Sequence, residues 1–342
     1  MHAGLTESQR ELRDSVRAVL LAECPPGVVR ACYDDPERWR GLWKTVVDLG
    51  WTEMAEPSND LGCVELVLVL EELGRVAAPI PFLSTVGLSA GALAATSQDA
   101  SYEVAGHPAS LLWLGSGDRC LEPTLAVEDG RVRGHAGEVA DAPRAERFVA
   151  LARAKGGHVL VTFAPGSVSI EQGQALDPSR PLATVSVDAV PDSMVAVSLH
   201  EALTVPLTAA AAELVGVAQR LLDLAVTYAK TREQFGQPIG SFQGIKHKLA
   251  DTYVAVERAR SLTYLAAMTV DASEGAWRHA LLAKAVASET AMAAARACVQ
   301  VHGAIAQTWE HDVHLFVRRA WQSAASMGDA RVLYKEAARS CI

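Results

Sequence analysis

The chain has 342 residues, half of them hydrophobic and 21% charged, with a formal net charge of −9. This length is enough for two or three domains with ample core. The acidic balance argues against a nucleic-acid binder, which needs a basic face, and apolar runs fall short of the ~20 residues that span a membrane. A polar N-terminus without a secretory signal and scattered cysteines predict reduced thiols in a cytoplasm. The cysteines are Cys24, Cys32, Cys63, Cys120, Cys298 and Cys341.

Residues 1–105 have the apolar periodicity of helices and form the first expected domain. Thr6 is placed to cap the first helix, because a threonine hydroxyl accepts from the free amides of a first turn. Glycines and prolines divide the segments that follow. Further helices are expected over residues 37–49, 64–73 and 84–95.

The sequence changes character over residues 106–203, where short β-branched or alternating runs are divided by Gly, Asp and Pro. The pair Asp129-Gly130 is typical of a tight hairpin turn. This segment is therefore expected to be a small and mostly antiparallel β domain.

Long amphipathic helices return in residues 204–342, the third expected domain. Short loops between such helices favour an antiparallel bundle. The fold class is therefore α+β and mainly α: an N-terminal helical domain, a middle β domain and a C-terminal four-helix bundle. The helices are expected over residues 208–234, 242–271, 276–302 and 310–336.

The strings TREQFGQPIGSFQ and QVHGAIAQTWEHD, together with this domain order, resemble the acyl-CoA dehydrogenase family. The resemblance covers essentially the whole chain. It implies α,β-desaturation of an acyl-CoA thioester, with FAD as hydride acceptor and an electron-transfer flavoprotein as the next electron carrier.

Six residues are expected to contact FAD. The cofactor presents a pyrophosphate and a flat adenine, which call for a forked cation, an aromatic surface, an amide and close backbone approach. In the family the corresponding segment reaches FAD held largely by a neighbouring subunit. The alternative interpretation is a salt-bridged arginine and a core phenylalanine at a helix end. The six residues are Arg232, Phe235, Gly236, Gln243 and, by resemblance, Gln300 and Gly303.

The catalytic base is expected to be Glu213. The resemblance implies a glutamate near the C-terminus, but Met327 stands at that position and cannot accept a proton. Some family members carry the base on the first bundle helix, where Glu213 lies among alanines that would raise its pKa by desolvation. Gly216, on the same face, would leave room for a thioester. The alternative is a carboxylate stabilised by the helix dipole and reaching water.

Two departures from the family pattern lead to a hypothesis about assembly. Alanines replace two glycines of the family's Gly-Gly-x-Gly at Ala304 and Ala306, and the family's flavin-facing loop at the start of the β domain is not recognisable. We therefore expect one subunit of a hetero-oligomer, α2β2, with a paralogous acyl-CoA dehydrogenase subunit as partner. A non-catalytic companion subunit is the alternative, and an oxidase or hydratase of the same fold is a third.

Two further groups have less specific patterns. His311 and His314 have a spacing that occurs in metal sites, but a third ligand is not evident and a solvated or helix-pairing role is favoured. The pair Arg318-Arg319 is compatible with a contact to an opposing subunit or to a coenzyme A phosphate.

Overall fold

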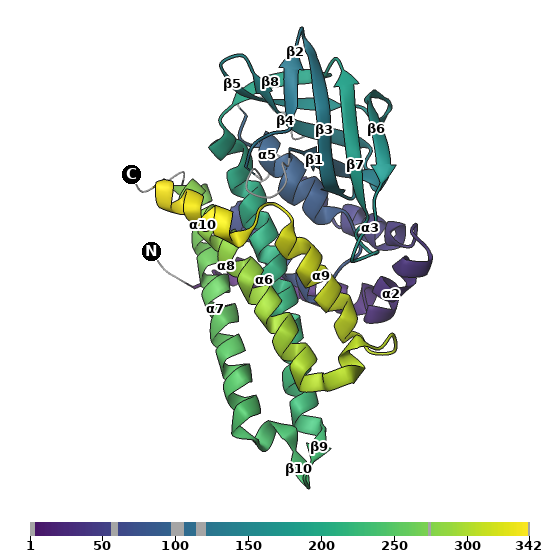
Figure 1. Ribbon diagram of the computed structural model, residues 1–342, viewed down its shortest axis with the longest axis vertical. Coiled ribbons are helices and arrows are strands. Elements are labelled where there is room, and N and C mark those ends of the chain that lie inside the picture. The colour runs from purple at the N-terminus through teal and green to yellow at the C-terminus, as the bar shows by residue number, and fades with distance from the viewer. Residues whose placement is uncertain (1–3, 56–60, 97–105, 114–120, 273–274, 341–342) are drawn as a thin grey trace.

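The computed structural model describes residues 4–55, 61–96, 106–113, 121–272 and 275–340. A layer of helices, an open sheet and a bundle of long helices follow one another along the chain (Figure 1). This arrangement confirms the expected fold class. Of the cysteines, Cys24, Cys32, Cys63 and Cys298 are buried and unbridged, whereas Cys120 and Cys341 lie outside the described residues.

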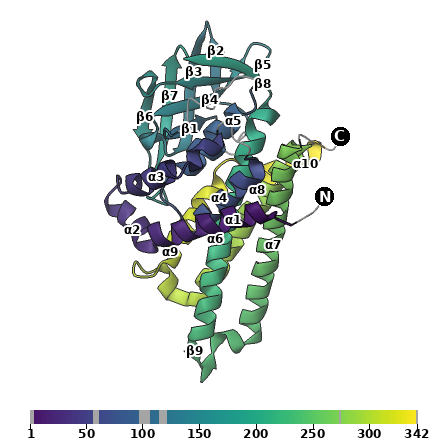
Figure 2. The same cartoon turned by 180° about the vertical axis from the view of Figure 1, so that it is seen from behind.

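The N-terminal helices cross one side of the bundle (Figure 2). Thr6 caps the first of them as expected, since its hydroxyl accepts from the Gln9 amide and the Gln9 side chain accepts from the Thr6 amide. A helix that the periodicity did not predict begins at Pro26, whose fixed φ suits the first helical position. The elements are α1 (Glu7–Glu23), α2 (Pro26–Asp34), α3 (Trp39–Asp48), α4 (Cys63–Arg75), the π-helical η2 (Leu83–Ala90) and α5 (Gly91–Leu93).

The middle region is one twisted sheet in the order β6-β7-β3-β2-β4-β5-β8, with β1 paired in parallel to β4. The predicted turn joins β2 to β3, and both its residues, Asp129 and Gly130, have the positive φ that a tight hairpin requires. The strands are β1 (Ala109–Leu112), β2 (Leu125–Glu128), β3 (Arg131–Ala140), β4 (Arg147–Ala154), β5 (Gly157–Phe163), β6 (Val168–Gln172), β7 (Leu182–Ala189) and β8 (Ser193–Val197).

The C-terminal region is a bundle centred on α6 (Leu199–Thr231), which is packed by α7 (Gln243–Asp271), α8 (Ala276–His302), α9 (Val313–Ala325) and α10 (Ala330–Arg339). The expected start of α6 at residue 208 was wrong. Ser198 and Glu201 form a capping box, so that α6 begins at Leu199, nine residues before the expected start. The helix then runs through Pro206. By length and composition α6 resembles a membrane span, but 89% of its apolar 18-residue window is buried inside the fold.

The single helix expected over residues 310–336 is in fact two helices. The break lies at Met327 and Gly328, whose φ values of +58° and +107° end α9. The buried ammonium of Lys284, on α8, donates to carbonyl oxygens at the end of α9 and in the break, among them Ala324 at 2.9 Å, Ser326 at 2.5 Å and Gly328 at 3.4 Å. A cation at the C-terminal end of a helix satisfies its free carbonyls and its dipole. Lys284 therefore fixes the loop that carries Met327.

Candidate functional site

Glu213 lies in a buried ion-pair network between α6, α9 and the segment before β7. Both oxygens of its carboxylate accept from the guanidinium of Arg180, one of them at 2.6 Å. Arg319, which is fully buried, lies 3.4 Å from the same carboxylate and donates to Asp177 at 2.5 Å. Ser323 adds a hydroxyl 3.3 Å away. The lone carboxylate of the alanine run is therefore held by charged and polar partners on several sides.

The pKa expected for Glu213 was wrong in direction. Burial by itself raises the pKa of this carboxyl, but the positive charges of Arg180 and Arg319 outweigh burial and hold the pKa below its usual range. A carboxylate with a lowered pKa and bidentate arginine contact is a weak proton acceptor at neutral pH. Nor does Glu213 reach water, since it is 2% exposed, so the helix-dipole alternative does not describe it either.

Gly216 does not leave room for a thioester. A Cβ built on it would lie 1.9 Å from the carbonyl oxygen of Glu71, on α4. The contact is reciprocal, because a Cβ on Gly74 would lie 2.2 Å from the carbonyl oxygen of Glu213. The two glycines let the backbones of α4 and α6 cross in contact. Gly216 is therefore a packing residue.

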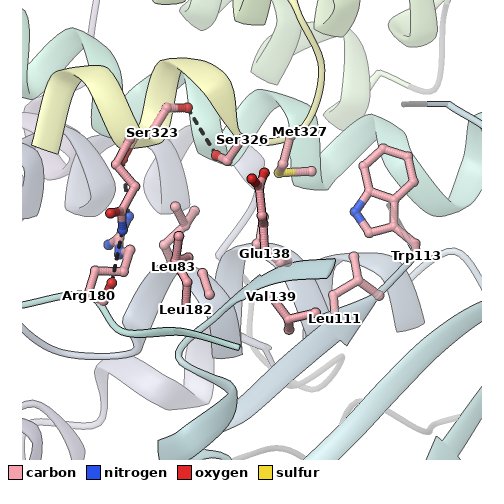
Figure 3. A pocket seen from close by; sticks show the side chains of 13 residues that line it. Leu83, Leu111, Trp113, Glu138, Val139, Arg180, Leu182, Ser323, Ser326 and Met327 are labelled. Carbon is pink, nitrogen blue, oxygen red and sulfur yellow. Dashed lines mark hydrogen bonds between the residues drawn. The ribbon is translucent and has the colours of Figure 1, made fainter. Parts of the chain in front are cut away.

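Met327 lines a small cavity between the sheet and the bundle (Figure 3). The cavity has a volume of about 40 Å³ and is mainly apolar, with Leu83, Leu111 and Trp113 among its walls. Water occupies ≈ 30 Å³ in the liquid, and ligand pockets usually exceed about 300 Å³. The space beside the vacated base position is therefore large enough for a water molecule and too small for an acyl chain.

A larger cleft of about 930 Å³ opens next to this cavity, between β3 on one side and α8, α9 and α10 on the other. Glu138, Ser326 and Met327 line both spaces. Residues 114–120, where the chain departs from the family's flavin-facing loop, lie outside the described residues. The charged and titratable groups that line the cleft are His135, Glu138, Glu289, Arg296 and Asp329.

The six residues predicted to contact FAD lie elsewhere, in the part of the bundle away from the sheet: at the connection between α6 and α7, and at the C-terminal end of α8 (Figure 1). The helical rise of about 1.5 Å per residue places Arg232 roughly 28 Å from Glu213 along α6. A hairpin of β9 (Glu233–Gln234) and β10 (Gln237–Pro238) carries three of the six. The C-terminal end of α8, which carries the other predicted segment, packs against α6 there through stacking of Tyr228 on His302 at 4.3 Å.

These six residues are exposed. Phe235, at the turn of the hairpin, is 92% exposed, and its ring meets the ring of Phe242 edge to face. Arg232 forms no ion pair with any residue in the part of the chain that the structure describes. The alternative interpretation of a core phenylalanine and a salt-bridged arginine is therefore wrong. A cation and an aromatic ring that project from one end of the molecule suit a ligand held by another subunit.

Ala304 and Ala306, the two alanines that replace glycines of the family pattern, have different surroundings. Ala306 is 1% exposed and packs in the bundle core, whereas Ala304 lies at the surface next to Gly303. Gly303 has a φ of +71° and ends α8, so a glycine is kept where the backbone turns. The methyl group of Ala306 thus points to the protein interior.

The residues present fit FAD in one of these two places. The exposed hairpin end offers a guanidinium, an aromatic ring, amides and a glycine, which suit a pyrophosphate and adenine. The cleft next to the sheet has three carboxylates against one arginine and a histidine. An anionic cofactor does not match that set of charges, so the cleft does not fit FAD.

Two buried histidines of the bundle give a pH prediction: His302, which stacks on Tyr228, and His314, which stacks on Trp309. Burial lowers the pKa of both imidazoles, so folding favours their neutral forms. Their stabilising contribution is complete above the unfolded pKa of ~6.5 and is lost as pH falls through the folded values. We expect the melting temperature to fall between pH 7.5 and 5.5, and the fall to be smaller in His302→Gln. An equal fall in that variant would contradict the assignment to His302.

Arg180 and Glu138 are site residues that sequence reasoning missed. Both come from the β region, where the pattern offered only alternation and turns. Arg180 binds Glu213, and Glu138 lines the small cavity together with Met327. Arg319 was considered for a partner or coenzyme A phosphate, but it is fully buried among Asp177, Glu213 and backbone carbonyls. Arg318 donates to the carbonyl of Leu176 at the surface.

Comparison with known proteins identifies the family. The model of the acyl-CoA dehydrogenase C-terminal domain matches residues 199–341, and that of the N-terminal domain matches residues 6–103. The chain belongs to the acyl-CoA dehydrogenase family, flavoprotein oxidoreductases that act on CH–CH donors and normally carry FAD.

The relatives include bacterial proteins of the same length. Acyl-CoA dehydrogenase IpdE2 of Mycolicibacterium smegmatis is 32% identical over 96% of either chain. Among solved structures, the ChsE4-ChsE5 complex from Mycobacterium tuberculosis has a TM-score of 0.90 at 27% identity, covering 100% of this chain and 99% of that one. A variant of the Tcur3481-Tcur3483 steroid ACAD has a TM-score of 0.88 at 25% identity and covers 97% of each chain.

Proposed function

We propose that this chain is one subunit of a heteromeric acyl-CoA dehydrogenase. Its hairpin end contacts FAD that is held by a paralogous partner. One observation carries the proposal: the exposed cofactor-type residues lie at one end of the molecule, while the cleft at the other end does not fit FAD. Two of the similar solved structures are of paired proteins, ChsE4-ChsE5 and Tcur3481-Tcur3483.

The assembled enzyme desaturates an acyl-CoA thioester between the α and β carbons, and FAD supplies the hydride acceptor when bound. Arg232 and Phe235 of this chain would hold the pyrophosphate and adenine of FAD, and Gly236 and Gly303 would allow close approach of backbone amides. Met327 cannot take the α-proton, and Glu213 is held by Arg180. Neither position that the sequence offered for the base accepts the proton, so we assign the base to the partner and the companion role to this chain.

The remaining partners and the location follow from that role. An electron-transfer flavoprotein reoxidises the flavin, the assembly is α2β2, and the enzyme works in the cytoplasm. The acyl group belongs to the partner's pocket; the steroid ACAD among the similar structures makes steroid side chains the first class to assay.

Co-expression with the paralogous subunit tests this proposal. We expect the chain purified alone to lack flavin absorbance, and the pair to contain FAD and to bleach on addition of acyl-CoA. A homotetramer of this chain with one FAD per subunit and full turnover would contradict it.

Arg232→Ala in the assembled pair is expected to weaken FAD binding by about 1.5–3 kcal/mol, the value of a hydrogen bond to a charged group. FAD retained after dialysis measures the loss. Arg278→Ala is the matched control. Arg278 is also exposed, but it lies at the N-terminal end of α8, whereas the predicted cofactor segment is at the C-terminal end of that helix. Equal flavin retention in the two variants would show that Arg232 does not contact the cofactor.

A further inference from the structure

The cleft next to the sheet has no role in the function proposed so far. Its sheet side is formed at an irregularity of β3, where the register with β7 shifts between Ala136 and Val139. Glu138 lies in that bulge with a φ of +52°, which is unusual for a residue with a Cβ. Figure 3 shows its carboxylate pointing across the gap toward Ser326 and Met327 of the opposite wall.

The carboxylates of the cleft differ in what they already bind. Glu289 accepts from the hydroxyl of Tyr334 at 2.7 Å, and Asp329 accepts from the amide of Arg331 at the start of α10. Glu138 forms no hydrogen bond or ion pair within the described part of the chain. Glu138, with its unusual backbone conformation and an exposed carboxylate that is free to bind, therefore lines a large cleft.

The opposite wall of the cleft is mixed, since it carries Glu289, Arg296 and Asp329 as well as an apolar part. Trp321 is 43% exposed, and Met292, Ala324 and Ala325 lie beside it. A 930 Å³ space with an exposed indole on one wall and a free carboxylate on the other suits an occupant with both an aromatic ring and a cation.

This chain itself carries such a group at its other end. The β9-β10 hairpin presents the guanidinium of Arg232 and the ring of Phe235, both exposed. In a pair of like-folded subunits about a two-fold axis, each contact is made twice with the roles exchanged. If the hairpin of this chain reaches the partner's cleft, the partner's hairpin reaches this one.

We infer that the cleft between β3 and α8–α10 receives the basic, aromatic hairpin of the paralogous partner. The inference rests on the proposed function, since it requires that pairing. On the partner's side the hairpin of this chain meets FAD phosphates; on this side the carboxylate of Glu138 takes the place of the phosphate as the counter-ion. The exposed indole of Trp321 packs against the hairpin's aromatic ring.

Charge reversal at Glu138 tests the inference in the assembled pair. Glu138→Arg is expected to raise the dissociation constant of the pair about tenfold or more, measured with a labelled partner, and 0.5 M salt is expected to reduce the difference. Glu171→Arg is the matched control, because Glu171 is an exposed glutamate of the same sheet on β6. Reversing the partner's hairpin arginine, aligned with Arg232, to Glu is expected to restore binding to Glu138→Arg. Trp321→Ala, which leaves every charge in place, is expected to weaken pairing as well.

Two results would overturn the inference. Equal dissociation constants for Glu138→Arg and Glu171→Arg would show that Glu138 does not contact the partner. A second FAD in each wild-type heterodimer would show that the cleft holds a flavin instead. The proposed function has a separate readout, the loss of FAD in Arg232→Ala. If the pair forms with FAD on the partner while Glu138→Arg has no effect, only the inference fails.

Discussion

Replacing Glu213 with Gln is expected to lower the free energy of unfolding by about 3–5 kcal/mol, the cost of breaking a buried ion pair from one side. Arg180 and Arg319 keep their charges in the interior after the change, and both face the carboxylate that it removes. Urea unfolding at pH 7 measures the loss. In the Arg180→Met/Glu213→Gln double variant, the loss of unfolding free energy is expected to be smaller than the sum of the losses in the two single variants. The double variant removes one of the charges that Glu213→Gln leaves without a partner.

Glu201→Gln is the control for this experiment, because glutamine serves equally well in the capping box of the same helix. We expect that variant to unfold like the wild type. The sequence-based hypothesis that Glu213 is the base predicts a different result: flavin bleaching in the assembled enzyme slowed at least ~10²-fold, with FAD binding nearly unaffected. Such a result would show that the ion pair opens during turnover.

The same network fixes how stability depends on acid. The pKa of Glu213 is held below its usual range despite burial, and the Asp177 carboxyl next to Arg319 behaves likewise. Their contribution is therefore present above the unfolded pKa of ~4 and is lost as pH falls through the folded values. This loss occurs at more acidic pH than the loss from His302 and His314.

Gly216→Ala is expected to destabilise the chain by at least about 3 kcal/mol, at or beyond the upper end of ordinary overpacking. The new Cβ would lie 1.9 Å from the carbonyl oxygen of Glu71 and 2.9 Å from the amide nitrogen of Arg75. Both are backbone atoms of α4, so no side-chain rotation relieves the contact and the two helices must separate. Thermal and urea unfolding of the purified chain measure the effect.

Gly244→Ala gives the matched control within α7. A Cβ at Gly244 meets nothing within 4 Å, so the alanine should be neutral or stabilising by up to ~1 kcal/mol. If Gly216→Ala unfolds like Gly244→Ala, the contact between α4 and α6 relaxes at little cost. The assignment of Gly216 to helix packing would then be wrong, and its position next to the site would need another reason.

The sequence by itself was sufficient for the fold class and for the order of helices, sheet and bundle. These follow from local patterns: the 3.6-residue period of α7 and α8, the Thr6 capping box, and the Asp129-Gly130 turn between short strands. Each depends on residues close together in the chain, where periodicity and turn chemistry act. The long REQFG string likewise indicated the family without tertiary information.

Only the tertiary structure decided what the buried polar residues do. Glu213 among alanines has the pattern of a desolvated base, but Arg180 comes from the other side of the domain boundary and reverses the direction of its pKa shift. Gly216 likewise packs against α4, far earlier in the chain. A charge or a close contact acts over a few ångströms in space, whatever the separation along the sequence, and one-dimensional patterns do not record which segments meet.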